Sequence, residues 1–289
     1  TAVVSGTVVS ISMTYAEDVA SIPAHIPGVI AGVFSGFSMA SVIGVPIAST
    51  ITHVFGWRAA FITIFVATLA LLALLFMKLP RQNRLKAGSI LEQFKLFLDK
   101  RISIGCAIVF LAGASTYCFY TYLTPIFQQE LHIPDSMLSL ALLIFGIAAI
   151  TSNVSSGQVA NKTGIRMLPL IYIIQTVCLL LLPIATHNLI SGGLVLFILG
   201  VMMYLLNSPL QMHFLNIATR EHPACVNLAS SLISVFFNFG IAAGSAMGGV
   251  IVKYAGLRFV GIGGAVPGIG AIICAVILLQ IMKPGADIR

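Results

Sequence analysis

Long apolar runs separated by short polar turns dominate this sequence of 289 residues. Hydrophobic residues make up 58% of the chain and charged residues only 8%, and the mean hydropathy is +1.06. Soluble domains usually carry about 25% charged residues, so the chain is predicted to be a membrane protein. In lipid the backbone polar groups must be bonded within the structure, and a helix that crosses a bilayer core of about 30 Å needs roughly 20 apolar residues. The sequence therefore predicts an all-α, polytopic membrane helical bundle.

The apolar runs predict nine helices, separated by stretches rich in glycine, proline and charged residues. The predicted spans lie near residues 1–20, 28–52, 57–79, 102–127, 136–158, 167–186, 190–216, 224–252 and 259–282.

The fifteen lysines and arginines fall unequally on the two sides of such a bundle. Because cytoplasmic loops are enriched in positive charge, the side that carries twelve of them is predicted to be cytoplasmic, with the C-terminus on it and residue 1 outside. The excess of basic residues is therefore a topology signal, and we expect no nucleic-acid partner. The cytoplasmic set is Lys78, Arg81, Arg84, Lys86, Lys95, Lys100, Arg101, Lys162, Arg166, Arg220, Lys283 and Arg289, and the other set is Arg58, Lys253 and Arg258.

The cysteines and carboxylates give no sign of a metal centre or a catalytic site. None of the five cysteines forms a CxxC pair, and scattered cysteines in apolar runs are expected to be small buried hydrophobes. The acidic residues are too few for a carboxylate metal cluster. We expect no metal, no cofactor and no enzymatic activity. The cysteines are Cys106, Cys118, Cys178, Cys225 and Cys274.

Two segments match without a gap at an offset of 200 residues: "FSGFSMASVIGVPIASTITHVFGWRAAF" from Phe34 and "SVFFNFGIAAGSAMGGVIVKYAGLRFVG" from Ser234. Chance similarity between glycine-rich membrane helices is the alternative, but both segments leave the helix through the same Gly-x-Arg sequence. A true repeat has a unit of six helices, so both copies point the same way, as in two-halved transporters. On that reading three helices precede the printed chain and the parent protein has twelve. The paired positions include Gly44 with Gly244, Ile51 with Ile251, Gly56 with Gly256, and Arg58 with Arg258.

The repeat also predicts the domain boundaries. Residues 1–79 would be a partial N-terminal half with helices four to six, and residues 102–289 the C-terminal half with helices seven to twelve. Between them, residues 80–101 would form a cytoplasmic linker. Its sequence "SILEQFKLFLDKR" puts apolar residues on one face of a short surface helix, and an unstructured linker is the alternative.

The decapeptide "GQVANKTGIR" at residues 157–166 resembles the cytoplasmic loop signature of the major facilitator superfamily, Gly-x-x-x-Asp-x-x-Gly-x-Arg. The pattern falls on Gly157, Asn161, Gly164 and Arg166. In that family the acidic residue and the arginine form a charge-assisted latch that closes the cytoplasmic side. Asn161 replaces the acid here, so the resemblance implies a weaker gating latch. The alternative is a basic turn that only sets topology.

Two further stretches are similar to members of the same superfamily. "GVPIASTITHVFGWRAAF" resembles the fifth-helix region of proton-coupled efflux members, with Val45 interposed between Gly44 and Pro46 of the efflux-type motif. "SPLQMHFLNIA" and "FFNFGIAAGSAMGG" resemble the tenth and eleventh helices of the sugar and arabinose efflux branch, which also contains pumps for drugs and purine nucleosides. The resemblance implies a secondary transporter of the inner membrane that exports a small molecule in exchange for protons.

Polar residues inside the predicted spans mark the candidate substrate cavity, because such residues are costly unless they face the interior of the bundle. Several of them recur at helical spacing on one face of their segment. Interhelical hydrogen bonds without any ligand are the alternative explanation. The predicted cavity-lining residues are Tyr117, Thr121, Tyr204, Asn207, Gln211 and Asn238.

Proton coupling requires a titratable group, and no aspartate or glutamate lies in the middle of a predicted span. His213 is a possible proton site, because histidine titrates near neutral pH; an interfacial or hydrogen-bonded histidine is the alternative. Family members often carry the coupling carboxylate on the first helix, which this chain would lack.

The function expected from these observations is proton-coupled efflux of a small molecule by alternating access. The expected partners are the substrate, protons and the lipid bilayer, and we expect a monomer. A truncated, non-transporting remnant and a facilitator or uptake permease of the same fold are the alternatives.

Overall fold

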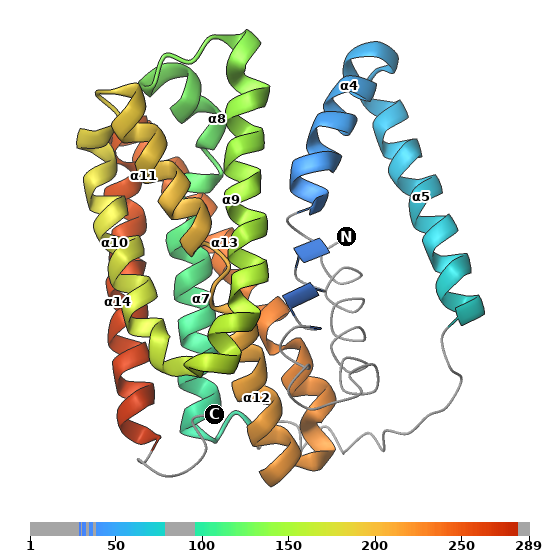
Figure 1. Ribbon diagram of the computed structural model, residues 1–289, viewed down its shortest axis with the longest axis vertical. Coiled ribbons are helices and arrows are strands. Elements are labelled where there is room, and N and C mark those ends of the chain that lie inside the picture. The colour runs from blue at the N-terminus through green and yellow to red at the C-terminus, as the bar shows by residue number, and fades with distance from the viewer. Residues whose placement is uncertain (1–28, 30, 33–34, 37–38, 79–95, 283–289) are drawn as a thin grey trace.

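The computed structural model describes residues 29, 31–32, 35–36, 39–78 and 96–282, and its regular secondary structure there is entirely helical (Figure 1). The predicted span at 1–20 and residues 80–95 of the predicted linker lie outside the described residues. The predicted span at 28–52 is described continuously only from Met39 onward.

Seven helical segments of the described chain are long and apolar enough to cross a membrane. They correspond one to one with the predicted spans from 57–79 to 259–282, which confirms these spans and the all-α fold class. The long helices are α4 (Val45–Phe55), α5 (Trp57–Lys78), α7 (Lys100–Tyr120), α9 (Asp135–Lys162), α10 (Leu168–Ala185), α11 (Leu189–Met202), α12 (Asn207–Glu221), α13 (Val226–Tyr254) and α14 (Val260–Ile281). Short elements are η2 (Ala40–Gly44), α8 (Leu123–Pro125), η3 (Ile126–Glu130), η4 (Gly164–Met167), η5 (Pro223–Cys225) and η6 (Leu257–Phe259).

The helix is interrupted within two of the predicted spans. The span 190–216 is broken at residues 203–206, between α11 and α12, and the span 102–127 is broken after Tyr120. Each break lies just before a proline, Pro209 and Pro125 respectively. Proline cannot donate a backbone hydrogen bond to the residue four positions earlier, and its ring clashes with that carbonyl group. The two prolines lie inside predicted spans, and the structure shows that the helix is interrupted just before each of them.

Helix α7 packs against α13 and α14, with its closest approach to α13 (Figure 1). Small residues make the contact possible. A Cβ atom added to Gly240 would lie 2.4 Å from the carbonyl oxygen of Phe110, and one added to Gly244 would lie 2.4 Å from that of Ala114. The two backbones therefore touch directly along this seam, as small residues permit in membrane helices.

Helices α4 and α5 pair with each other and stand to one side of the other long helices, with η2 in contact with α9 (Figure 1). They join at Gly56, which has φ 84° and ψ 163°. At an offset of 200 residues, Gly256 has φ 98° and ψ 160° where α13 gives way to η6. The same uncommon backbone conformation at both positions supports the repeat, because only glycine adopts it readily.

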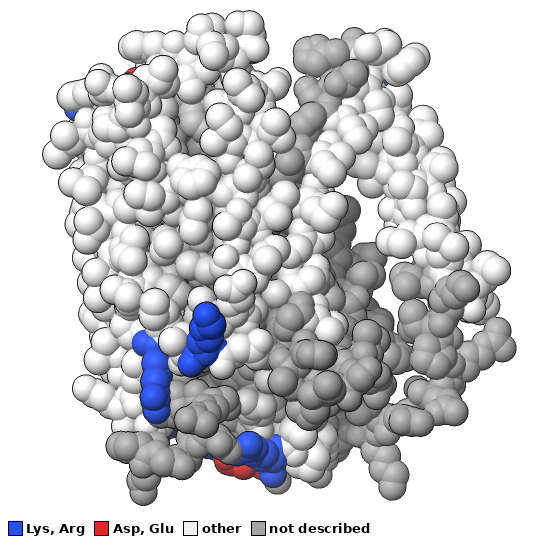
Figure 2. Space-filling view, viewed as in Figure 1, with Lys and Arg blue, Asp and Glu red and all other residues white. Residues whose placement is uncertain are grey.

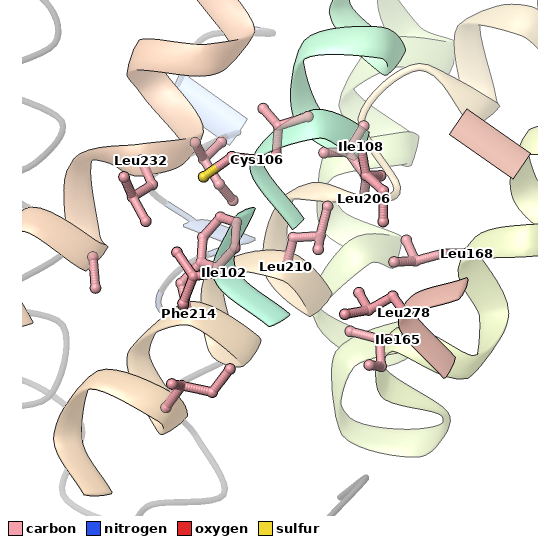
Figure 3. Close-up of a cluster of buried hydrophobic side chains, with 14 of the residues drawn as sticks. Ile102, Cys106, Ile108, Ile165, Leu168, Leu206, Leu210, Phe214, Leu232 and Leu278 are labelled. Atoms are coloured by element: carbon pink, nitrogen blue, oxygen red, sulfur yellow. The ribbon is translucent and has the colours of Figure 1, made fainter. Parts of the chain in front are cut away.

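A buried apolar cluster joins α7, α10, α12, α13 and α14 in the half of the bundle where α7 begins (Figure 3). It contains Phe214, whose ring lies against Gly105 at a place where a Cβ atom would be only 2.4 Å from the ring. Cys106, one of the predicted buried cysteines, belongs to this cluster.

The outer surface is apolar, as expected for helices that face lipid. Figure 2 shows a broad face without charge, and lysine and arginine gather toward one end of it. At that end, the lower end of Figure 1, α7 begins and α5, α9 and α12 finish. Lys78, Lys100, Lys162 and Arg220 lie at these helix ends.

Candidate functional site

The break between α11 and α12 is the centre of the candidate site, because it lies near the middle of the membrane span Leu189–Glu221. Tyr204 stands in this break. Its backbone N–H, which has no regular helical partner, donates to Ser152 Oγ of α9 at 2.8 Å. A side chain of the neighbouring helix thus satisfies a backbone donor that the break sets free, as buried backbone groups require.

Two more buried hydrogen bonds join α9 to the first turn of α12. Asn207 Nδ2 donates to Asn153 Oδ1 at 2.8 Å, and the hydroxyl groups of Ser156 and Ser208 lie 2.8 Å apart. Together with the Ser152 contact they form a polar seam, named here the α9–α12 seam. It fixes the break relative to α9.

Tyr117 of α7 approaches Tyr204 across the bundle, and their hydroxyl oxygens lie 3.5 Å apart. Phe237 of α13 contacts both rings, with ring centroids 5.8 Å from Tyr117 and 6.2 Å from Tyr204. The structure therefore brings these two predicted cavity residues together, with an aromatic partner that the sequence did not single out.

The other predicted cavity residues on α7 and α13 lie more openly. Thr121 is exposed at the upper end of α7, and its hydroxyl lies 2.8 Å from the hydroxyl of Ser245 on α13. Asn238 is also exposed, and its Nδ2 donates to the carbonyl oxygen of Ser234 one turn earlier at 2.6 Å. Exposed polar groups inside a membrane-spanning helix are expected to face protein or water rather than lipid.

Asn207 and Gln211, the remaining predicted cavity residues, are buried between helices. Asn207 belongs to the α9–α12 seam. Gln211 Nε2 donates to the carbonyl oxygen of Ser230 on α13 at 3.3 Å, whereas its Oε1 is buried without a hydrogen-bond partner among the described residues. The structure therefore separates these two from the exposed polar residues of α7 and α13.

His213, the possible proton site, is buried in the lower half of α12. Its Nε2 lies 3.4 Å from the carbonyl oxygen of Arg101 at the start of α7. The imidazole therefore lies where α7 and α12 meet, away from the tyrosine pair.

An ion-pair network holds the lower ends of α7 and α12 together. Arg101 binds both carboxylate oxygens of Glu221, and Asp99 caps α7 by accepting the Arg101 backbone N–H at 2.8 Å. Burial raises the pKa of Asp99, but the hydrogen bonds from Arg101 outweigh it and hold that pKa below its ordinary value. Ligand atoms of Asp99, Glu221 and His222 lie within 4.8 Å of one another. Because Arg101 already binds both carboxylates, we interpret the group as an ion-pair network and not as a metal site.

The predicted gating loop follows directly from the α9–α12 seam. Gly157 is buried in α9, while Asn161 and Arg166 are exposed at the lower end. Gly164 has φ 57°, a left-handed conformation that favours glycine and starts the turn into α10. Within the described part of the chain, neither Asn161 nor Arg166 forms a side-chain hydrogen bond or ion pair, so the latch stays a prediction.

The efflux-type motif lies where η2 passes into α4. Gly44 is the last residue of η2, and Pro46 is the second residue of α4, which continues directly from η2. A Cβ atom added to Gly44 would meet no atom of the described residues within 4 Å.

Several site residues were not identified from the sequence. Ser152, Asn153 and Ser156 recur at helical spacing within an apolar run, the same signal that singled out the cavity candidates on other helices. Gln175 is a further example: its Nε2 donates to Thr116 Oγ1 at 3.1 Å and joins α10 to α7.

Comparison with known proteins agrees with this architecture. A family model described as Major Facilitator Superfamily matches residues 1–227. The chain is 29% identical over 271 residues to the "Uncharacterized MFS-type transporter YtbD" of Bacillus subtilis, which covers 93% of this chain and 68% of that protein. It is 30% identical over 280 residues to the "Uncharacterized MFS-type transporter YbcL" of Bacillus subtilis, with 96% and 70% covered.

A third relative is the "Probable sugar efflux transporter" of Pasteurella multocida, which is 28% identical over 230 residues. That alignment covers 80% of this chain and 56% of the relative, so the chain spans little more than half of that protein's length. The family match, the apolar helices and the multi-pass bundle lead to one conclusion: the chain belongs to the Major Facilitator Superfamily of membrane transporters.

Proposed function

We propose that the protein is a secondary active transporter that exports a small molecule across the inner membrane in exchange for protons. The observation that carries the proposal is the broken span between α11 and α12, with Tyr204 in the break opposite Tyr117. Discontinuous helices near the bilayer midplane are where many secondary transporters bind their substrates. The direction of transport rests on the efflux-type motif and on one relative named as a sugar efflux transporter.

The pathway in this proposal runs along the face of α7 and α13 that carries exposed polar residues. Thr121 and Asn238 lie on it, and the tyrosine pair lines it at the middle of the bundle. Asn207 and Gln211 would stabilise the packing of the helices beside the pathway without contacting the substrate, since both are buried between helices. Substrate contact would then depend on Asn238 more than on Asn207.

The proposed orientation places the lower end of Figure 1 in the cytoplasm, because lysine and arginine gather at the helix ends there. The two predicted halves, residues 1–79 and 102–289, would tilt against each other around the pathway, and the loop from Gly157 to Arg166 would close its lower end. The transporter would act as a monomer.

His213 is the candidate for proton coupling. The carboxylates of the described residues, Asp99, Glu130, Asp135 and Glu221, lie at helix ends, whereas His213 is buried inside a span. Changing His213 to glutamine is expected to leave transport down a substrate gradient intact and to abolish its dependence on a proton gradient.

The test is transport by the complete gene product in proteoliposomes. With the lumen one pH unit more acidic, a transporter inserted with its cytoplasmic side outward should accumulate its substrate about tenfold at one proton per substrate, since one pH unit is worth about 1.4 kcal/mol. The panel contains arabinose, adenosine and the neutral aromatic amine N-phenyl-1-naphthylamine. Equilibration without accumulation would indicate a facilitator, and no pH-dependent accumulation of any compound would refute the proposal.

The site assignment is tested in the same vesicles. Asn238→Ala should lower the transport rate several-fold, while alanine at Leu180, an exposed apolar residue of α10, should leave it unchanged. Equal rates for both variants would remove Asn238 from the pathway.

A further inference from the structure

A groove of about 530 Å³ lies on the seam of α7 and α13, in the lower half of the bundle. Four phenylalanine rings form most of its wall, from α7, α13 and the segment just before α7. Its volume is within the range of 300–1,000 Å³ that is usual for small-molecule sites. The lining residues are Phe97, Ser103, Cys106, Ala107, Phe110, Phe236 and Phe239.

The groove continues into the proposed pathway. Ser103, Cys106, Phe110 and Tyr117 follow one another at spacings of 3, 4 and 7 residues, so they lie on one stripe of α7. On α13, Phe237 lies between the groove residue Phe236 and Asn238 and contacts the ring of Tyr117. A molecule beside Phe110 would therefore lie on the same stripe of α7 as Tyr117, about two helical turns nearer the start of the helix.

The rings in the wall are already ordered against one another. Phe236 contacts Phe97 at a centroid distance of 6.2 Å and Phe239 at 6.4 Å. The Phe239 side chain is 60% exposed, so it offers a free aromatic surface at the edge of the groove. Aromatic rings bind other rings in tilted and edge-to-face arrangements such as these.

The groove has few polar groups, and the hydroxyl group of Ser103 among them already has a hydrogen-bond partner. Among the described residues no charged side chain lines it, and the Ser103 hydroxyl donates to the carbonyl oxygen of Phe97. A sugar in this groove would leave its hydroxyl groups without partners, which is unfavourable in an apolar environment. An uncharged aromatic molecule would lose few hydrogen bonds with water and would gain contact with the rings.

Lipid is the other apolar material near such a surface, but the neighbouring polar groups argue against a lipid-facing groove. Asn238 is exposed next to Phe239, and Thr121 is exposed farther along α7. Polar side chains in membrane spans face protein or water-filled space. The groove therefore belongs to the same side of the bundle as the pathway.

We propose that this groove binds the substrate and that the substrate is an uncharged, lipophilic aromatic molecule. The proposal rests on the proposed function and deepens it, and it differs from the sugar in the name of one relative. Export of such a molecule would begin from the cytoplasmic half of the bundle, with its aromatic part against Phe236 and Phe239.

Binding can be measured without transport, because Trp57 is the single tryptophan of the chain. In a background in which Trp57 and every other tryptophan of the complete gene product are changed to phenylalanine, Phe239→Trp places a fluorophore at the groove, and Phe197→Trp places one on α11, outside it. N-phenyl-1-naphthylamine, which absorbs tryptophan emission, is added to the complete gene product in lipid nanodiscs. We expect saturable quenching at position 239 and only linear quenching, from partition into lipid, at position 197.

A second variant tests the wall itself. Phe236→Leu, added to the Phe239→Trp reporter, keeps an apolar side chain but removes a ring, and it should weaken the probe's Kd about tenfold. Excess sucrose should leave the Kd unchanged, and so should oleyl alcohol, a neutral acyl chain. If Phe236→Leu disrupts folding, the difference in quenching between the tryptophans at positions 239 and 197 still tests the proposal.

Three results would overturn the proposal: linear quenching at both reporters, competition by sucrose, or competition by oleyl alcohol that identifies an acyl-chain site. Saturable binding without transport of any compound would refute the proposed function and leave the groove assignment standing. Proton-driven transport of arabinose without binding of the aromatic probe would support the proposed function and refute the groove assignment.

Discussion

Replacing Ser152 with alanine should destabilise the bundle at the break between α11 and α12. The change removes the acceptor of the Tyr204 backbone N–H, which is buried and bonded at 2.8 Å. Leaving a buried donor unpaired costs about 1–3 kcal/mol, whereas interhelical hydrogen bonds in membranes average about 0.6 and reach about 1.7 kcal/mol. We therefore expect a loss of about 1–2 kcal/mol, which is about 5- to 30-fold in the unfolding equilibrium.

The assay is reversible unfolding in mixed detergent micelles, followed by far-ultraviolet circular dichroism. The matched control is Thr151→Ala: Thr151 is the preceding residue and is exposed, and among the described residues its hydroxyl bonds only to the carbonyl oxygen of Ile147 in its own helix. That variant should change the free energy of unfolding by less than about 0.5 kcal/mol. Equal effects of the two substitutions would refute the reasoning that α9 fixes the break.

Three further predictions concern other parts of the chain. Gly244→Ala should lower stability by about 1–3 kcal/mol, because its Cβ would meet the backbone of α7 at 2.4 Å, whereas Gly44→Ala, with nothing within 4 Å among the described residues, should be neutral in the same unfolding assay. Gly164→Ala should cost about 1–2 kcal/mol at its φ of 57°, and alanine with no effect on unfolding would contradict the turn geometry. Because Arg101 lowers the pKa of Asp99, the folded protein binds fewer protons there than the unfolded chain; the stability from this contact should be complete above pH 3.8 and lost as pH falls through the lowered pKa. Asp99→Asn should remove this acid dependence of the melting temperature, and an unchanged dependence would assign it to another group.

Hydropathy was sufficient to place the membrane helices that the structure describes, because each span must be apolar and must satisfy its own backbone hydrogen bonds in lipid. The span predicted at 57–79 is the helix Trp57–Lys78, and the one at 259–282 is Val260–Ile281. The break at 203–206 could not be placed from hydropathy, since its residues are as apolar as the helices beside it. Pro209 was the available signal, but a proline in a membrane helix indicates irregularity without fixing which residues leave the helix.

Helical spacing predicted which polar residues share a face but not what each face meets. Tyr117 and Tyr204 lie on different spans, and only the fold brings their hydroxyls together. Asn207 shares a predicted face with Tyr204, yet its partner is Asn153 of α9. Packing between helices decides such contacts, and periodicity within one helix does not contain that information.

The internal repeat could be recognised from the sequence because close helix contacts and positive φ angles require small residues at matching positions. Gly244 is required by the backbone of α7, and Gly256 by its positive φ. Gly56 also has a positive φ, whereas Gly44 has no close neighbour among the described residues. The repeat therefore predicts the glycine turn in both copies, at Gly56 and Gly256. It predicts the close helix contact only at Gly244, whose partner helix α7 the structure describes.

The claim that the face of α7 and α13 is a water-accessible pathway can be tested most directly by single-cysteine labelling. With every native cysteine replaced, including the five of this sequence, Asn238→Cys is treated in intact vesicles with a membrane-impermeant maleimide, and Leu180→Cys, on an exposed apolar surface of α10, is the control. We predict that the cysteine at position 238 reacts and the one at 180 does not. Reaction at neither position, or equally at both, would contradict the account.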